Sequence, residues 1–166
     1  LKKHQAQTIL SLLEDSEGNI WIGCYGQGII IYNPKTKKSK QILSDNSTIG
    51  TITKLIQDKN GIIWAGTFAA GLFAINPKTM GYRQYSESNG LPSNTIYCIF
   101  ENKEDNTIWT GTLNGGLSIL NFITNSEKPF VTTFKHIDNK NSLSSNSVNN
   151  IYKDSKGLYW ISTNNG

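Results

Sequence analysis

The chain has 166 residues, of which 37% are hydrophobic and 17% are charged, with a formal net charge of +4. This composition is typical of one soluble, rather polar globular domain and excludes a disordered chain. No apolar run approaches the roughly 20 residues that a membrane-spanning helix needs. The opening stretch, LKKHQAQTIL, lacks the apolar core and cleavage site of a signal peptide. The chain begins and stops without tails, and we expect it to be a segment of something longer.

The positive charge comes almost entirely from lysine, because Arg83 is the single arginine. The lysines are dispersed, apart from a small cluster at residues 35–40. Nucleic-acid binding usually needs a concentrated basic face, often with arginines that contact bases. We therefore predict no nucleic-acid partner and interpret the lysines as solvated turn and edge-strand residues.

The sequence consists of four copies of one unit, marked by Trp21, Trp64, Trp109 and Trp160. These tryptophans lie 43, 45 and 51 residues apart, and the four-stranded blade of a propeller repeats at about 40–50 residues. We predict an all-β fold, a β-propeller fragment of four-stranded antiparallel blades with three full blades and half of a fourth. Within the partial propeller of residues 1–166, the blades are expected at about 7–44, 49–87 and 94–138, and the half blade at about 146–166.

Each copy opens with an apolar strand that ends in a tight turn, such as DSEGN in the first copy. The Asp of this turn accepts backbone N–H bonds, and the Gly supplies a positive φ at low cost. The turn residues are Asp15 and Gly18, Asp58 and Gly61, and Asp154 and Gly157. In the third copy Asn102 replaces the Asp and Asn106 takes the Gly position, which Asn tolerates better than most residues.

The second strand of each copy carries the Trp, followed two positions later by Gly23, Gly66, Gly111 or Ser162. A large ring near a missing side chain predicts interlocking blades, with the Trp of one blade filling the space that its neighbour leaves. The third strands read IIIYN, LFAIN and LSILN, and a polar fourth strand follows, which suits an exposed outer edge.

The same residues argue against chemistry at the turns. DSEGN lacks the ligand series of a calcium loop, and the repeated acids are spread around a ring instead of facing each other across a pocket. His4 and His136 have no nucleophile or acid beside them in the sequence. We predict no catalytic residue, no metal and no cofactor.

Cys24 and Cys98 fall two blades apart and in different strands of the unit. A disulfide requires Cα atoms within roughly 7 Å, and no CxxC or Cys/His cluster indicates zinc. We predict free, buried thiols.

A binding role is predicted for one end of the propeller, where the loops between second and third strands meet the loops that link successive blades. Aromatic rings and side-chain amides in these loops suit the C–H faces and hydroxyl rims of sugars. The ligand-binding candidates are Tyr25, Gln27, Phe68, Asn114, Asn164, Asn165, Asn94 and Asn146, with Leu113 and Asn46 beside them.

Two alternatives remain open at these positions. Asn is an ordinary turn residue, and Phe68 could pack inside a blade. The polar residues of the innermost strands are candidates to line the channel or a water column: Lys54, Tyr97, Asn149 and Asn150.

The stretch GLPSNTIYCIFEN…IWTGTLNGGL, within residues 90–117, closely resembles the two-component regulator propeller repeat. DSEGNIWIGCYGQGI, DKNGIIWAGTFAAGL and SLSSNSVNNIYKDSKGLYWISTNNG look like the same repeat. The departures are small: Cys24 stands where Thr67, Thr112 and Thr163 stand, and the third turn lacks its Gly.

The resemblance implies the periplasmic sensor of a hybrid two-component system, common in gut bacteria that degrade polysaccharides. It implies two successive seven-bladed propellers, an immunoglobulin-like domain, a transmembrane helix, a histidine kinase and response-regulator parts. Ligands in this family are typically oligosaccharides released from glycans, and their binding alters a homodimer and hence the kinase. Any catalysis is therefore expected in other parts of the parent protein.

We therefore expect a ligand-sensing propeller segment, with the remaining blades of the parent chain and a second protomer as partners. A purely structural or protein-interaction propeller is the alternative. A propeller enzyme similar to streptogramin lyases, which have Asp-x-x-Gly-x-x-Trp blades, is less favoured because neither histidine is well placed at the mouth.

Overall fold

The computed structural model describes residues 8–44, 50–122 and 128–166, so that His4 and Asn46 lie outside the described residues. The described strands form three four-stranded antiparallel sheets and one two-stranded sheet. Blade 1 contains β1 (Ile9–Glu14), β2 (Ile20–Cys24), β3 (Ile29–Asn33) and β4 (Lys38–Ile42). Blade 2 contains β5 (Ile52–Gln57), β6 (Ile63–Thr67), β7 (Leu72–Ile75) and β8 (Tyr82–Tyr85). Blade 3 contains β9 (Ile96–Asn102), β10 (Thr107–Thr112), β11 (Gly116–Asn121) and β12 (Phe130–Phe134), and the half blade contains β13 (Val148–Lys153) and β14 (Tyr159–Thr163).

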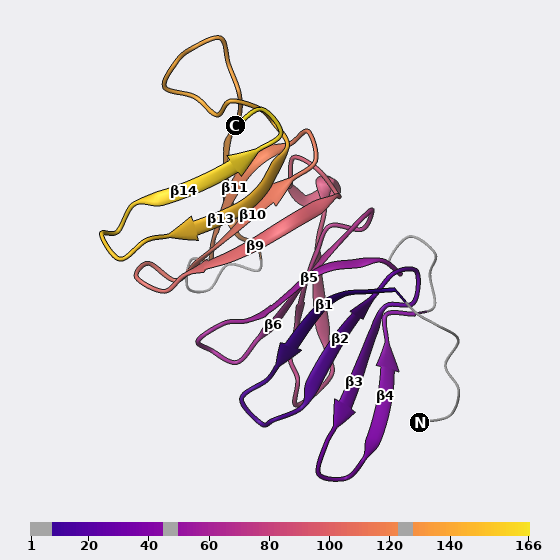
Figure 1. Ribbon diagram of the computed structural model, residues 1–166. Helices are drawn as coiled ribbons and strands as arrows, with labels where there is room; N and C mark the ends of the chain where they lie inside the picture. Colours follow the sequence, from indigo (N-terminus) through magenta and orange to yellow (C-terminus); the bar gives the residue numbers. More distant parts are fainter. Residues whose placement is uncertain (1–7, 45–49, 123–127) are drawn as a thin grey trace.

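The sheets follow one another along the chain as the blades of a fan (Figure 1). In each complete blade the strand order equals the chain order, and the first strands β1, β5, β9 and β13 contact each other in succession. The last strands, β4, β8 and β12, are mostly exposed, as their polar sequences predict. One 3₁₀ turn, η1 (Glu87–Asn89), precedes β9. The predicted class, three full blades and half of a fourth, is confirmed.

The core lies between blades, not within them. Trp21 of blade 1, with no exposed surface, packs in one cluster with Ile52 and Phe73 of blade 2. Trp64 of blade 2 packs in a second cluster with residues of blade 3. Trp109 of blade 3 stacks on Tyr159 of the half blade, with ring centroids 4.5 Å apart. Each of these three tryptophans therefore packs against the next blade along the chain.

The prediction for the small residue after each Trp was wrong in one respect, because an aliphatic side chain of the next blade occupies the space there, not a tryptophan. A Cβ added at Gly23 would lie 2.8 Å from Cγ2 of Ile52, and one at Gly66 would lie 2.9 Å from Cγ2 of Ile96. At Gly111 the Cβ would meet Sγ of Cys98 in its own blade and, at 2.7 Å, Cγ1 of Val148 in the half blade. The first β-branched residue of each inner strand thus presses directly on the backbone of the preceding blade.

The turn between the first two strands has the predicted geometry. Asp15 accepts backbone N–H bonds from Glu17 at 3.0 Å and Asn19 at 2.8 Å, and Gly18 has a φ of +82°. Asn106 takes a φ of +60° at the Gly position of the third copy.

A second hydrogen bond of this Asp was not predicted from the sequence. Its other carboxylate oxygen accepts the indole N–H of the Trp in the next strand: Asp15 from Trp21 at 2.8 Å, Asp58 from Trp64 at 2.8 Å, and Asp154 from Trp160 at 2.9 Å. In the third copy, which lacks the Asp, Trp109 donates to the Thr107 hydroxyl at 2.8 Å instead. The constant six-residue spacing of Asp and Trp was the signal that could have revealed this bond.

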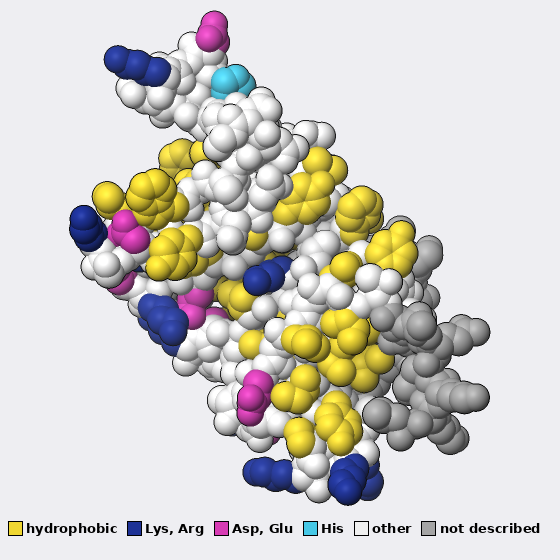
Figure 2. Space-filling view, in the orientation of Figure 1, with side chains coloured by type: hydrophobic (Ala, Val, Ile, Leu, Met, Phe, Trp, Pro, Cys, Tyr) yellow, Lys and Arg dark blue, Asp and Glu magenta, His cyan; other side chains and the backbone are white. Residues whose placement is uncertain are grey.

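The two end sheets expose apolar side chains that complete blades cover. Hydrophobic side chains are visible over both the first sheet and the two-stranded sheet (Figure 2). They include Leu12 on β1, and Tyr152 and Trp160 on the half blade, each more than 60% exposed. Within the described ranges, no helix has the length and apolarity needed to cross a membrane.

Candidate functional site: the mouth loops

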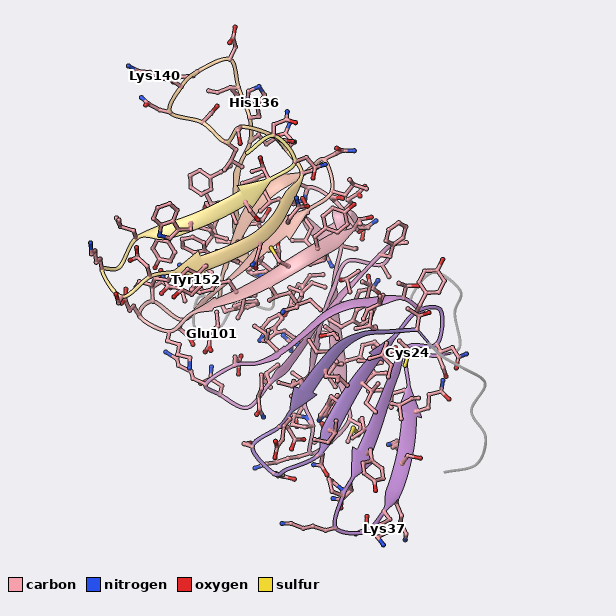
Figure 3. All side chains as sticks on the ribbon, viewed as in Figure 1. Cys24, Lys37, Glu101, His136, Lys140 and Tyr152 are labelled. Atoms are coloured by element: carbon pink, nitrogen blue, oxygen red, sulfur yellow. The ribbon has the colours of Figure 1, made fainter. Side chains whose placement is uncertain are left out.

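The blades have two distinct ends, which Figure 3 marks with Cys24, where β2 finishes, and Lys37, in the turn between β3 and β4. The Cys24 end gathers the loops that follow the second strands and the segments that link one blade to the next. We call these the mouth loops: residues 25–28, 68–71, 113–115 and 164–166, with the linking residues 50–51, 86–95 and 135–147.

Each mouth loop is fixed to its own blade by one repeated hydrogen bond. The N–H group of the first loop residue donates to the carbonyl of the residue just before the first strand. The pairs are Tyr25 to Thr8 at 2.8 Å, Phe68 to Thr51 at 3.0 Å, Leu113 to Thr95 at 3.0 Å and Asn164 to Ser147 at 3.1 Å.

The loops of the three complete blades are also fixed to the linker that leads into the next blade. Gly28 donates to the Gly50 carbonyl at 2.7 Å, Gly71 to Asn94 at 2.8 Å, and Gly116 to Asn146 at 2.7 Å. Gly71 has a φ of +80°, and a Cβ there would lie 2.1 Å from the Tyr85 carbonyl oxygen. The glycine is therefore required by both backbone conformation and space.

Hydroxyl side chains at the start of each inner strand complete this frame, and the sequence analysis did not single them out. The Thr51 hydroxyl accepts the Gly26 N–H at 3.0 Å, and the Ser147 hydroxyl accepts the Asn114 N–H at 3.2 Å. Thr95 donates its hydroxyl to the Phe68 carbonyl. The signal was the Thr or Ser that opens all four copies of the repeat.

These hydrogen bonds fix the backbone of the first residue of each mouth loop, whereas the side chain at this position differs among the blades. Tyr25 is 65% exposed and Phe68 is 52% exposed, so Phe68 is not packed inside its blade. Asn164 is exposed and Leu113 is partly buried at the same position of the repeat. Two aromatic rings thus stand at the mouth on successive blades.

The predicted amide side chains accept hydrogen bonds from different parts of the protein. Asn94 accepts the Glu87 N–H at 2.8 Å, and Asn146 accepts the His136 N–H at 2.7 Å, so both oxygens hold the linkers in shape. Asn114 accepts a bond from the Ser147 hydroxyl at 3.0 Å, and Asn164 accepts one from the Asn149 side chain at 2.9 Å.

The remaining candidates lie in the same loops. The Gln27 carbonyl accepts a bond from the Gln41 side chain at 2.8 Å, and the Asn165 N–H donates to the Thr163 hydroxyl at 3.3 Å. The structure therefore groups the predicted residues by blade junction: Tyr25 and Gln27 at the first, Phe68 and Asn94 at the second, and Asn114 and Asn146 at the third.

The inner strands share an irregularity beside the mouth. The register of each shifts near its start, so that Thr53, Tyr97 and Asn149 occupy bulges and Lys54 and Asn150 follow them. Lys54 and Asn150 are exposed, and Tyr97 is partly buried.

Neither cysteine forms a disulfide, and both thiols are buried, as predicted. Burial raises the pKa of Cys98 to about 11, although a bond with the Gly111 backbone and the charge of Lys54 oppose that effect. Burial also raises the pKa of Cys24. Both sulfurs are therefore protonated and inert at neutral pH.

No group of three or more His, Cys, Asp or Glu residues that could hold a metal occurs in the described part of the chain. His136 lies on the long linker before β13, where the loop with Lys140 projects from the blades (Figure 3). Its ring Nδ1 lies 2.6 Å from the Leu143 carbonyl oxygen, which ties the imidazole to its own loop.

Comparisons with known proteins match this repeated frame. The family model described as two component regulator propeller matches residues 4–26, 46–69, 90–114 and 142–165, more than half of the chain. None of the curated proteins compared with the chain matches it.

The fold is similar to solved extracellular domains from B. thetaiotaomicron. That of BT3049, described as a hybrid two component system, is 32% identical with a TM-score of 0.74, and the match covers 94% of this chain and 20% of that one. That of BT4673, described as a one component or a hybrid two component system, is 25% identical with a TM-score of 0.77, over 96% of this chain and 21% of that one. The chain thus spans about a fifth of these domains.

Virginiamycin B lyase from Staphylococcus aureus has the same fold at 19% identity, with a TM-score of 0.69, over 94% of this chain and 49% of that one. At this identity the likeness concerns the fold alone.

Proposed function

The chain belongs to the two-component regulator propeller family, and we propose that it is a ligand-sensing segment of the extracytoplasmic propeller of a hybrid two-component sensor. Its ligand is an oligosaccharide from glycan breakdown, recognised at the mouth loops. The parent sensor signals to polysaccharide-utilisation genes through a histidine kinase in its other domains.

The observation that carries this proposal concerns the first residue of each mouth loop. Its backbone is held by the same hydrogen bond in every blade, whereas its side chain differs from blade to blade. Tyr25 and Phe68 start from backbones held by equivalent hydrogen bonds, 2.8 and 3.0 Å long, yet both rings remain more than half exposed. A rigid backbone reduces the entropy lost when a ligand binds. An exposed ring on such a frame suits the apolar face of a sugar.

A scaffold or protein-interaction propeller without a small ligand is the second candidate. It is favoured by the amides of Asn94 and Asn146, whose oxygens hold their own linkers and so are less available to a ligand. In that case the exposed rings at the mouth contact another protein.

The proposal assigns no catalysis to this segment. Two of the solved relatives, at 25% and 32% identity, are extracellular domains of signalling systems, and the lyase likeness extends only to the fold. His136, a candidate general base in a lyase, is bonded to its own loop.

The proposal places the segment in the periplasm as part of an inner-membrane protein. Its partners are further blades of the parent chain and a second protomer of the sensor. The exposed apolar side chains of both end sheets, among them Leu12 and Trp160, are consistent with cover by further blades. Light scattering on the parent sensor tests the homodimer, which a monomer would contradict.

The ligand proposal is tested by calorimetric titration of the parent sensor with a panel of glycan-derived oligosaccharides. We expect one class to bind, and Phe68→Ala and Tyr25→Ala to weaken its binding about tenfold each, as the loss of a stacking ring predicts. Phe130→Ala is the matched control, because Phe130 is 66% exposed on β12, away from the mouth.

The scaffold candidate gains if no oligosaccharide binds while the sensor stays dimeric. The mouth assignment fails if Phe130→Ala weakens binding as much as Phe68→Ala does.

A further inference from the structure

A cavity of about 490 Å³ lies between blades 2 and 3 and is lined by Asp58 and Asn60 of one turn and by strands β7 and β8. The turn with Asp58 and Asn60 and the turn with Asn106 in blade 3 both lie at the end of the blades opposite the mouth loops. The volume is within the range of small-molecule sites. We call it the blade 2–3 groove.

Three aromatic side chains form one wall of the groove. The Trp64 ring lies 6.0 Å from that of Tyr85 and 5.4 Å from that of Phe122, centroid to centroid. Trp64 and Tyr85 are buried, and Phe122, from blade 3, is partly exposed. The wall is therefore apolar and fixed by mutual packing.

Arg83 places a positive charge at the outer side of the groove. It lies on β8, is exposed, and pairs with Ala74, another lining residue. Burial raises the pKa of the nearby Tyr85 phenol, although the positive charge of Arg83 opposes that effect, so that the phenol is neutral. In the described part of the chain Arg83 has no carboxylate partner. A planar guanidinium in this state suits a carboxylate, which it can bind through two parallel bonds.

The rim adds hydrogen-bond donors. Asn76 uses its side-chain oxygen for the Lys78 and Thr79 N–H groups, and Asn106 uses its oxygen for the Asn60 amide at 3.3 Å. The NH₂ groups of Asn76 and Asn106 have no partner among the described residues. Both residues line the groove, so these donors suit ligand hydroxyls.

Among the described lining residues Asp58 is the one acid, and it lies away from Arg83. Its oxygens accept N–H groups from Asn60 at 2.9 Å, Ile62 at 2.9 Å and Trp64 at 2.8 Å. It lies between β5 and β6, whereas Arg83 lies on the outermost strand, which separates them by roughly two to three strand spacings of about 4.8 Å.

The equivalent junction between blades 1 and 2 lacks these features. By strand register, Lys40 and Ile42 of β4 stand where Arg83 and Tyr85 stand in β8. Pro77 follows the third strand of blade 2 where Phe122 follows that of blade 3. Because the repeat does not require the aromatic wall or the guanidinium, they mark a site particular to one junction.

We propose that the blade 2–3 groove binds a small sugar acid, a hydroxylated ring with one carboxylate. The carboxylate lies on Arg83, the ring lies against Phe122, and hydroxyls accept from Asn76 and Asn106. The site is separate from the mouth loops and does not depend on the function proposed for them.

The test uses the 166-residue chain with ¹⁵N-labelled arginine, because the single arginine gives one Nε–H resonance. Titration with glucuronate should shift this resonance, while glucose should bind at least about tenfold more weakly, since it lacks the charge-assisted bonds. In calorimetry, Arg83→Gln should weaken glucuronate binding at least about tenfold and Lys40→Gln should not change it. Phe122→Pro, which installs the residue of the other copies, should weaken it several-fold.

The proposal is overturned if the Arg83 resonance stays in place at saturating glucuronate, or if glucose binds equally well. It is also overturned if Lys40→Gln weakens binding as much as Arg83→Gln, because the charge effect would then be nonspecific. Benzoate that binds as tightly as glucuronate would show that the hydroxyl contacts contribute nothing. Phe68→Ala should leave glucuronate binding unchanged. The binding proposals for the mouth loops and for the blade 2–3 groove are therefore tested independently.

Discussion

Trp21 of blade 1 and Trp160 of the half blade occupy the same position of the repeat, yet their surroundings differ. Each donates its indole N–H to the Asp of its own turn, at 2.8 and 2.9 Å. Trp21 has no exposed surface because blade 2 covers it, whereas Trp160 is 61% exposed.

The comparison separates what one copy of the repeat does from what two copies do together. The turn and its Asp–Trp bond form inside one copy, with or without a neighbour. Burial of the ring needs the next blade. The mouth loops depend on the second kind of contact, because Gly28 and Gly71 bond to linkers that lead into the next blade.

Replacing the covered ring should have the largest effect. Trp21→Ala is expected to lower the free energy of unfolding by about 3–5 kcal/mol, through lost burial and the cavity left between blades. Trp160→Ala, at the same repeat position, should cost less than about 1 kcal/mol. Urea titration followed by circular dichroism measures both, and equal losses would contradict the role given to the next blade.

The thiols report whether the half blade stays closed on blade 3. Cys98 packs in one cluster with Val148 of the half blade, and burial raises its pKa to about 11. Its reaction with Ellman's reagent at pH 7.5 should be at least about 100-fold slower than in urea. Val148→Ala should speed modification of Cys98 and leave that of Cys24 unchanged; a rapid reaction in the unmodified chain would mean an open half blade.

The glycine after the Trp gives a smaller change. Gly66→Ala places a Cβ against Ile96 of blade 3 and should cost about 1–3 kcal/mol by overpacking. Ser162 holds the equivalent place on the half blade, and Ser162→Ala should stay within about 0.5 kcal/mol. In a double-mutant cycle, Gly66→Ala and Ile96→Ala should be non-additive; additive losses would show that the two residues do not press on each other.

The smallest effect concerns pH. Burial raises the pKa of Asp15, but hydrogen bonds from Trp21 and Asn19 outweigh it and hold the pKa below its ordinary 3.8. A lowered carboxylate pKa stabilises the fold at pH above 3.8, and this contribution is lost as the pH falls through the folded-state pKa. Unfolding measured from pH 5 to 2 should therefore show a shallower loss in Asp15→Asn than in the unmodified chain.

Asp154, the counterpart of Asp15 on the half blade, should change the pH dependence of unfolding in the same direction. The Trp160 bond and the Leu158 N–H lower the pKa of Asp154, although this hairpin is uncovered. A pH dependence altered by Asp15→Asn but not by Asp154→Asn would mean that the Asp–Trp bond needs a neighbouring blade.

The fold could be predicted from the sequence because its signals are local and repeated four times. The Asp and Gly of a turn need only their own few residues, and even Asn106 at the glycine position was interpretable from its tolerance of positive φ. The spacing of the tryptophans then gave the blade.

Contacts between copies of the repeat could not be predicted from the sequence in the same way. That Ile52 and Ile96 fill the space at Gly23 and Gly66 depends on how one sheet lies on the next. The groove around Arg83 depends likewise on Phe122, which a different copy supplies. The amides of Asn94 and Asn146 resembled free ligand groups in the sequence, and only the linker geometry shows them bonded to Glu87 and His136.

Hydrogen–deuterium exchange on the parent sensor, with and without its oligosaccharide, shows whether the mouth loops bind the ligand. We expect added protection in residues 25–28 and 68–71, and none in the turns at the opposite end, such as residues 15–19. Protection confined to those turns, or unchanged exchange at the mouth with ligand bound, would contradict this expectation.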